Sequence, residues 1–192
     1  MQTIKLTEKD FKDKIYIGKE DLTNIEGNLE IEATGWLRFE SDIFAKGYIS
    51  AEGDISAEGY ISAEGYISAK GDISAEGYIS AKGYISAEGY ISAKGDISAE
   101  GYISAEGGIL KALYGITAGL KIYAKTTIES GMRIFAGTAP WSWVTKEHRE
   151  IKCGKLLKGE IAYGDLVETG LEEKSEKSDD IIKVNGVKYK KI

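Results

Sequence analysis

The sequence predicts an all-β fold: a parallel triangular β-solenoid, a single-stranded β-helix in which short strands wind into a rod. Three observations predict it. A six-residue unit, Gly-(Tyr/Asp)-Ile-Ser-Ala-(Glu/Lys), recurs without a break from Gly47 to Glu106. Apolar or small residues alternate with polar ones inside each unit, and charges at the unit's last position are mostly opposite in sign at a spacing of three units. An internal repeat that contains a period of two is typical of stacked strands.

The repeat extends beyond its most regular part, so we expect the solenoid to cover residues 25–137. In the backward direction the same register reaches Ile43, Leu37, Ile31 and Ile25. In the forward direction it reaches Ile109, slips by one residue, and resumes at Ile116, Ile122, Ile128 and Ile134. We expect the extra residue to form a corner bulge between Leu110 and Gly115, since a lasting slip of one residue would turn every side chain over.

The alternation within the unit identifies strands and an interior. Ile, Ala and Gly occupy one parity, whereas Ser, Glu or Lys, and Tyr or Asp occupy the other. A helix is excluded, because a glycine at every sixth position would cost it roughly 1 kcal/mol each. A lone unit buries one Ile, so the units must stack Ile on Ile, each burial contributing roughly 1.5 to 3 kcal/mol.

Surface charges set the length of one coil. Residues one coil apart lie about 4.8 Å from each other, where opposite charges attract and like charges repel. With three units per coil, six of eight neighbouring Glu/Lys pairs between positions 46 and 106 are opposite in sign, against two of seven with four units and three of nine with two units. Three units give three sides, so we expect a triangular rod of about six coils.

A small residue two positions before an aliphatic one marks each unit, as in Gly47 and Ile49, Gly59 and Ile61, and Gly101 and Ile103. In this the chain resembles the hexapeptide-repeat left-handed β-helix proteins. The resemblance covers a little over half the chain, and it implies a fold rather than a function. A right-handed rod of similar triangular section, as in the bactofilins, is the alternative.

Segments outside the repeat are expected to cap and extend the rod. Residues 1–24 form an N-terminal cap, with a strand at Thr3–Leu6 and a helical turn that starts at Thr7. Residues 138–169 form a C-terminal cap with strands at Glu150–Leu156 and Glu160–Val167. Residues 170–180 form a charged linker, and residues 181–192 a β-hairpin whose turn is Asn185-Gly186.

Composition excludes several classes of partner. A net charge of −6 disfavours nucleic acid, whose phosphates need a basic surface. No stretch approaches the roughly 18 apolar residues of a membrane span, so we expect no membrane insertion, and the N-terminus has no apolar signal-peptide core. Cys153 is the only cysteine, which rules out an intrachain disulfide and is compatible with the cytoplasm.

Aromatic residues are the candidate binding residues. With three units per coil, one column contains Tyr48, Tyr66, Tyr84 and Tyr102. This column is suited either to stack sugar rings or meet another protein, or to stabilise the rod by aromatic pairing. Trp141 and Trp143 beside the only proline are the other candidates, either as a ligand cage or as a plug over the last coil.

Catalytic chemistry finds little support, and we expect no catalytic residue, no metal site and no cofactor. His148 is the only histidine, and a general base needs partners that the sequence does not identify. Asp54, Asp72 and Asp96 are spaced singly, unlike the clustered oxygen ligands of calcium, and we expect them to be solvated. Cys153 is expected to be a buried, inert thiol.

These observations predict a non-enzymatic rod, a structural or protein-interaction scaffold that forms homo-oligomers or binds another protein. A module that binds carbohydrate or a surface, such as a phage-related one, is the alternative, with a glycan as its ligand. A degenerate acyltransferase is a second alternative, since many proteins of the resembled family are acyltransferases with a histidine beside the solenoid. It would require a role for His148.

Overall fold

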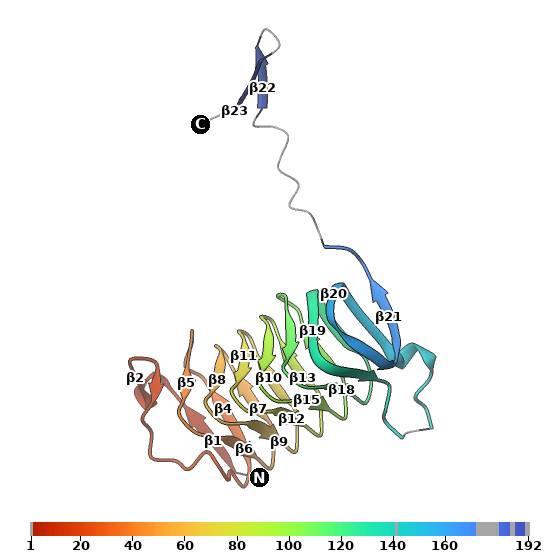
Figure 1. Ribbon diagram of the computed structural model, residues 1–192. Coiled ribbons are helices and arrows are strands. Elements are labelled where there is room, and N and C mark those ends of the chain that lie inside the picture. The colour runs from red at the N-terminus through yellow and green to blue at the C-terminus, as the bar shows by residue number, and fades with distance from the viewer. Residues whose placement is uncertain (1, 141, 172–180, 185–186, 191–192) are drawn as a thin grey trace.

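Short parallel strands stack along one axis in the computed structural model, which describes residues 2–140 and 142–171 with the backbone of 181–184 and 187–190 (Figure 1). The fold is nearly all-β, a parallel β-solenoid of about eight turns. Strands on the first side are β1 (Thr3–Leu6), β4 (Asn28–Ile31), β7 (Ile49–Ala51), β10 (Ile67–Ala69), β13 (Ile85–Ala87) and β16 (Ile103–Ala105).

Two further sides complete each coil. The second side has β3 (Ile15–Tyr16), β5 (Arg38–Phe39), β8 (Ile55–Ala57), β11 (Ile73–Ala75), β14 (Ile91–Ala93) and β17 (Leu110–Ala112). The third side has β6 (Ile43–Ala45), β9 (Ile61–Ala63), β12 (Ile79–Ala81), β15 (Ile97–Ala99) and β18 (Ile116–Ala118). The long strand β19 (Ile122–Ala136) pairs in turn with β16, β17 and β18, so it bends round all three sides.

Register confirms the predicted coil of three units. Ile67 pairs with Ile49 on one side and with Ile85 on the other, and the same spacing holds on the second and third sides. Every isoleucine from Ile43 to Ile103 at the unit's third position is fully buried, and the alanines two residues later are at most 5% exposed. A ladder of Ile on Ile, flanked by Ala on Ala, is therefore the core of the rod.

The one-residue slip lies earlier than predicted. Leu110, not Ile109, pairs with Ile91, and Leu110 is fully buried whereas Ile109 is 43% exposed. The predictions that Ile109 continues the core and that the bulge follows Leu110 were therefore wrong. The extra residue falls in the corner that contains Gly107 and Gly108, where two adjacent glycines let the chain take a wider turn before the next strand.

The N-terminal register also differs from the prediction. Leu29 pairs with Ile49, and Ile31 pairs with Ala51, so this coil is two residues longer than the regular ones. Ile25 likewise bridges to Ala45. The two extra residues fall between Ile31 and Gly35, a glycine with a φ of +79°. An insertion of two residues preserves parity, so Ile31 and Ile25 stay buried although they occupy the alanine ladder and not the isoleucine ladder.

Parallel pairing continues at both ends of the rod, so the turns number about eight where about six were expected. At the N-terminal end β1 pairs in parallel with β4. At the other end β20 (Glu150–Tyr163) pairs with β19, and β21 (Asp165–Glu168) pairs with β20. One long strand and one short strand therefore replace the two expected at Glu150–Leu156 and Glu160–Val167.

Aromatic rings close the N-terminal end. The predicted strand at Thr3–Leu6 is confirmed as β1, and the turn after Thr7 is a 3-10 helix, η1 (Glu8–Asp10). Strand β2 (Phe11–Lys12) then folds back antiparallel to β3. Phe11, Tyr16 and Phe39 form a cluster with ring centroids 5.6 to 5.8 Å apart. This cluster covers the first buried side chains of the second side.

Two elements lie outside the coils. A second 3-10 helix, η2 (Lys146–Arg149), belongs to the segment between β19 and β20. The predicted C-terminal hairpin is confirmed by antiparallel pairing of β22 (Ile181–Val184) with β23 (Val187–Lys190). Its predicted turn, Asn185-Gly186, and residues 172–180 of the predicted linker lie outside the described residues.

Glycines at the corners are required by the close stacking of coils. A Cβ on Gly71 would lie 1.8 Å from Oδ1 of Asp54, and one on Gly89 would lie 1.9 Å from Oδ1 of Asp72. A Cβ on Gly83 would meet the backbone of Gly65 at 3.0 Å. A larger residue at Gly83 must shift the backbone of the neighbouring coil, and one at Gly71 or Gly89 must displace the aspartate carboxylate of the preceding coil.

Gly71→Ala should therefore lower the free energy of unfolding by about 1 to 3 kcal/mol, as overpacking does in a close-packed interior. Gly108→Ala is the matched control, because the nearest atom to its Cβ would be Oγ1 of Thr126 at 3.6 Å. Urea denaturation followed by circular dichroism measures both. Equal midpoints for the two variants would contradict the packing argument.

The corrected position of the slip has its own test. Leu110→Ala should cost about 2 to 5 kcal/mol of stability, the usual range for a buried leucine. Ile109→Ala should cost less than about 0.5 kcal/mol, as at an ordinary surface position. Thermal unfolding of the two variants compares them directly, and the reverse order of stability would restore Ile109 to the core.

Candidate functional site

The predicted tyrosine column exists as a continuous ladder. Tyr48, Tyr66, Tyr84 and Tyr102 stand one above another at the start of the first side's strands, and consecutive ring centroids lie 4.8 to 4.9 Å apart. Their ring planes agree within 3°. The spacing is that of the strands themselves, so the rod imposes the stack on the side chains.

Stacking decides which parts of the rings other molecules can reach. Each inner ring has a tyrosine on both faces, so the ladder offers ring edges and hydroxyl groups to solvent. Tyr102, the last ring, is 40% exposed. Burial raises the pKa of the Tyr66 hydroxyl, and the hydrogen bond to Glu30 raises that of Tyr48. The hydroxyls of Tyr48 and Tyr66 are thus more strongly held in the protonated, hydrogen-bonding form.

Aspartates at the tyrosine position have a role that the sequence did not reveal. Oδ1 of Asp54 accepts a hydrogen bond from the N–H of Asp72 at 3.0 Å, and Oδ1 of Asp72 accepts one from the N–H of Tyr90 at 2.9 Å. Asp96 does the same for the N–H of Gly115 at 2.7 Å. The expectation of simple solvation was incomplete: each side chain satisfies a corner N–H one coil further along. Aspartate's preference for such backbone bonds was the available signal.

Glutamate and lysine form ion pairs between coils. Lys70 pairs with Glu52, Lys94 with Glu76, and Lys82 with Glu64 at an Nζ–Oε2 distance of 3.2 Å. In all three pairs the lysine contacts the glutamate of the preceding coil, as the spacing of three units predicts. These side chains are 44% to 65% exposed, so solvent screens each pair and its contribution to stability is small.

Trp143 does not form the predicted plug. Trp141 lies outside the described residues. Trp143 is 53% exposed and belongs to the segment between β19 and β20, so the expectation that it covers the last coil was wrong. Its indole meets the ring of His148 edge-on, with centroids 5.2 Å apart. Nδ1 of His148 in turn accepts a hydrogen bond from the N–H of Thr145 at 3.1 Å. These contacts give His148 a local structural role.

Cys153 is buried in the alanine ladder of the first side, where it pairs with Ala124. Burial, followed by the nearby charge of Glu168, raises the pKa of its thiol to about 11. At neutral pH the side chain is therefore a protonated thiol rather than a nucleophilic thiolate.

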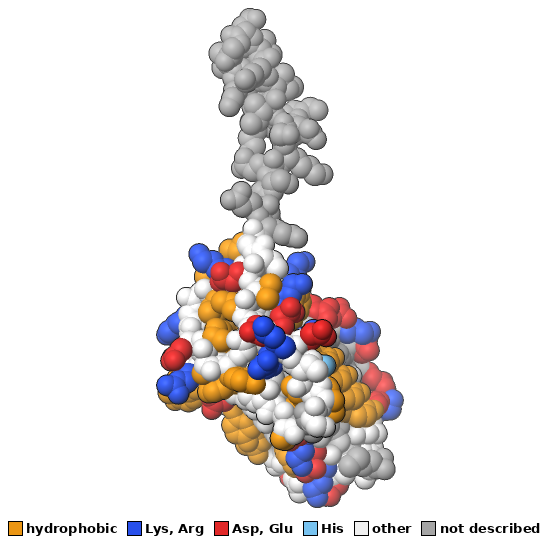
Figure 2. All heavy atoms as spheres, turned by 90° about the vertical axis from the view of Figure 1, so that its right-hand side faces the viewer, with side chains coloured by type: hydrophobic (Ala, Val, Ile, Leu, Met, Phe, Trp, Pro, Cys, Tyr) orange, Lys and Arg blue, Asp and Glu red, His pale blue; other side chains and the backbone are white. Residues whose placement is uncertain are grey.

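The C-terminal end is the least regular surface. Figure 2, which faces this end, shows hydrophobic side chains interspersed with charged ones. An open hollow of about 700 Å³ lies beside β19 and β20, and its lining includes Arg133, Lys158 and Glu160. Nε of Arg133 lies 3.4 Å from Oε2 of Glu160. Across the described part of the chain, no three His, Cys, Asp or Glu side chains gather as a metal site would need.

Comparison with known proteins gives no relative. No family model, no curated protein and no solved structure matches the chain. No helix within the described residues is long and apolar enough to cross a membrane.

Alkylation of Cys153 tests its burial. A pKa of about 11 leaves about 100-fold less thiolate at pH 8 than an ordinary thiol has. Reaction with a thiol reagent should therefore be at least about 100-fold slower in the folded chain than in denaturant, with the rate rising as pH approaches 11. Cys153 is the only cysteine, so the signal has one source. Similar rates in both states would contradict a buried, protonated thiol.

Proposed function

We propose that this chain is a non-enzymatic structural and protein-interaction rod, with a second copy of itself among its partners. The observation that carries the proposal is that the outward side chains form straight rows of Tyr or Asp, Ser and Glu/Lys on all three sides, which repeat at the spacing of the coils. A rigid surface with one short period suits a partner of the same period. Another copy of the same chain necessarily has that period.

Ring geometry favours this proposal over carbohydrate binding at the tyrosine ladder. A sugar stacks on the face of an aromatic ring, and the faces of Tyr66 and Tyr84 are covered by their neighbours. Binding of a protein at the ladder's edges and hydroxyls stays a prediction. The acyltransferase alternative depended on His148, whose Nδ1 is engaged by Thr145.

Kinship with the hexapeptide-repeat proteins is part of the proposal. It is supported by the Gly-x-Ile unit and by three strands in each coil. A cytoplasmic location also stays a prediction, with which a single buried thiol, Cys153, is compatible.

Multi-angle light scattering on the intact chain tests the proposal. We expect a particle that contains more than one copy and dissociates on dilution. The matched variant changes Tyr48, Tyr66, Tyr84 and Tyr102 to Ser. We expect it to remain associated if it stays folded, because the ladder's ring faces are engaged within the rod. A monomer at every concentration would contradict self-association, and loss of association in the folded variant would place the interface on the ladder.

A further inference from the structure

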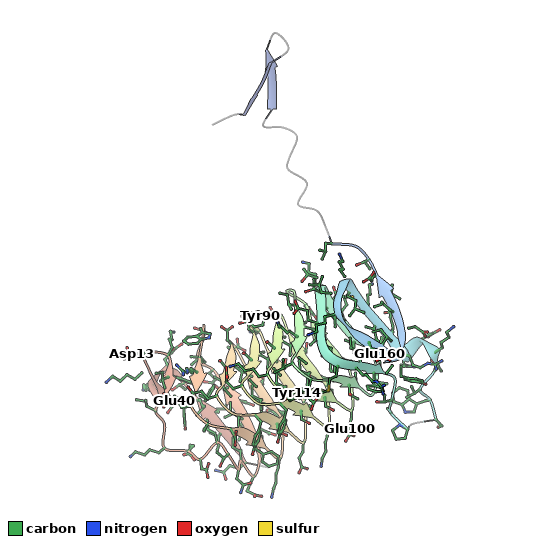
Figure 3. All side chains as sticks on the ribbon, in the orientation of Figure 1. Asp13, Glu40, Tyr90, Glu100, Tyr114 and Glu160 are labelled. Carbon is green, nitrogen blue, oxygen red and sulfur yellow. The ribbon has the colours of Figure 1, made fainter. Side chains whose placement is uncertain are left out.

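One row of charges on the rod alternates strictly in sign. It consists of Glu26, which follows Ile25, and of the residues that follow β6, β9, β12 and β15, namely Lys46, Glu64, Lys82 and Glu100; we call it the alternating row. Pairing of Ile25 with Ala45, and of Ala45, Ala63, Ala81 and Ala99 with one another, sets these residues one coil apart. Figure 3 shows Glu100 on the margin of the rod opposite to Tyr90.

The other two rows do not alternate. On the first side the corresponding row is Glu32, Glu52, Lys70, Glu88 and Glu106. On the second side it is Glu40, Glu58, Glu76, Lys94 and Leu113. Like charges are therefore adjacent in both of these rows, whereas no two adjacent members of the alternating row share a sign.

The alternating row is accessible and only partly neutralised within its own chain. Its first four side chains are between 42% and 66% exposed, and Lys46 pairs with Glu26 as Lys82 does with Glu64. Glu100 is exposed, and among the residues described it has no ion-pair partner. A partner that presents the opposite sequence of signs at the same spacing would meet a favourable charge at every position.

We propose that two copies of this chain pair side by side and antiparallel through the alternating row. Reversal of direction sets Lys46 opposite Glu100 of the second copy and Glu64 opposite Lys82, so four opposite-sign pairs form across the twofold axis. No displacement is needed to match the rows, because both copies have the same spacing between coils. A twofold axis makes one surface its own complement. The inference rests on the proposed function, and it names the partner and the surface.

The segment between β19 and β20 limits the possible registers. Ala139 bonds to the carbonyl of Gly119, which follows β18 as Glu100 follows β15, so the segment leaves the rod at the end of the alternating row. Figure 1 shows it standing out from the last coils. When Glu64 faces Lys82 of the second copy, the segment of each copy lies one coil beyond Glu26 of the other copy.

A register shifted by two coils toward the C-terminal ends would bring this segment against Lys46 and leave only two opposite-sign pairs. A register shifted by two coils the other way would pair Glu26 with Lys82 and Lys46 with Glu64, but it would not set Tyr60 opposite Tyr78.

Aromatic side chains on the same side support this arrangement. Tyr60 and Tyr78 stack with centroids 4.8 Å apart at the start of β9 and β12, and Tyr78 is 43% exposed. In the antiparallel pair Tyr60 lies opposite Tyr78 of the second copy, in the middle of the contact. The same column sets Asp42 opposite Asp96 of the second copy, and these carboxylates are bonded to the N–H groups of Tyr60 and Gly115 in their own chains. The pair of copies would thus have an aromatic centre and a charged margin, as protein interfaces commonly do.

Sedimentation velocity on the intact chain tests the proposal, with Lys82→Glu as the disrupting variant. Each exposed ion pair strengthens association by no more than a few-fold, so we expect reversible pairing that weakens as salt rises from about 0.05 to 0.5 M. Lys82→Glu replaces two attractions by two repulsions across the axis, and should weaken pairing at least tenfold. Circular dichroism confirms that the variant is folded.

Lys94→Glu is the matched control. It removes the same kind of intrachain ion pair, with Glu76 in place of Glu64, and changes the net charge equally, but it lies on the second side. Pairing should persist in this variant within about threefold of the intact chain, since any loss comes only from general charge repulsion. Equal weakening by Lys94→Glu and Lys82→Glu would overturn the proposal.

Inversion of the row provides a second variant. Lys46→Glu, Glu64→Lys, Lys82→Glu and Glu100→Lys together keep the net charge and the alternation among these four positions, which form the four pairs across the axis, so this chain should again pair with itself. Failure of the folded, inverted chain to pair would also refute the assignment of this surface. If none of these changes affects association, the copies do not pair through the alternating row, but the proposed self-association of the rod stands. If the intact chain does not associate at all, both proposals are refuted.

Discussion

The stacking of one isoleucine on another is the interaction on which the rest of the structure depends. Strands in a parallel sheet lie about 4.8 Å apart, and three units of the repeat return the chain to the same side at that height. Once Ile67 rests between Ile49 and Ile85, every other position of the unit is also repeated one coil away. Glycine, tyrosine, serine and charged residues thus fall into rows without needing any attraction of their own. The tyrosine ladder and the alternating row are both consequences of the buried ladder.

Much of this could be predicted from the sequence, because the deciding signals were periodic. The length of the coil followed from the signs of charges, and the column from Tyr48 to Tyr102 followed from the coil. The errors arose where residues were inserted. Ile109 and Leu110 are both aliphatic, and only the path of the corner at Gly107 and Gly108 decides which of them is buried. Near Ile31 the insertion has even length, so hydrophobic alternation continues and the changed register leaves no trace in the pattern.

At the candidate site, too, periodic features were predicted correctly and non-periodic ones were not. Periodicity predicted which tyrosines share a column, but not that their rings lie parallel within 3° and so cover each other's faces. Trp143 and His148 belong to a segment without a repeat, where neighbours in space cannot be read from spacing. The aspartates were misread for a different reason: their carboxylates bond to backbone groups, and a backbone partner has no residue type that a sequence could display.

The coil register also has a consequence for how such a rod can change over generations. Duplication of three units in the central part would add one full turn, raise the length by about 4.8 Å, and leave both ends facing as before. Duplication of a single unit would keep isoleucine on isoleucine, yet it would rotate one end by a third of a turn and reassign every charge beyond it to another side. Selection that preserves the rows of side chains would therefore favour rods that differ by whole turns. The length of the rod could then change in steps of one turn while each side keeps its own residues.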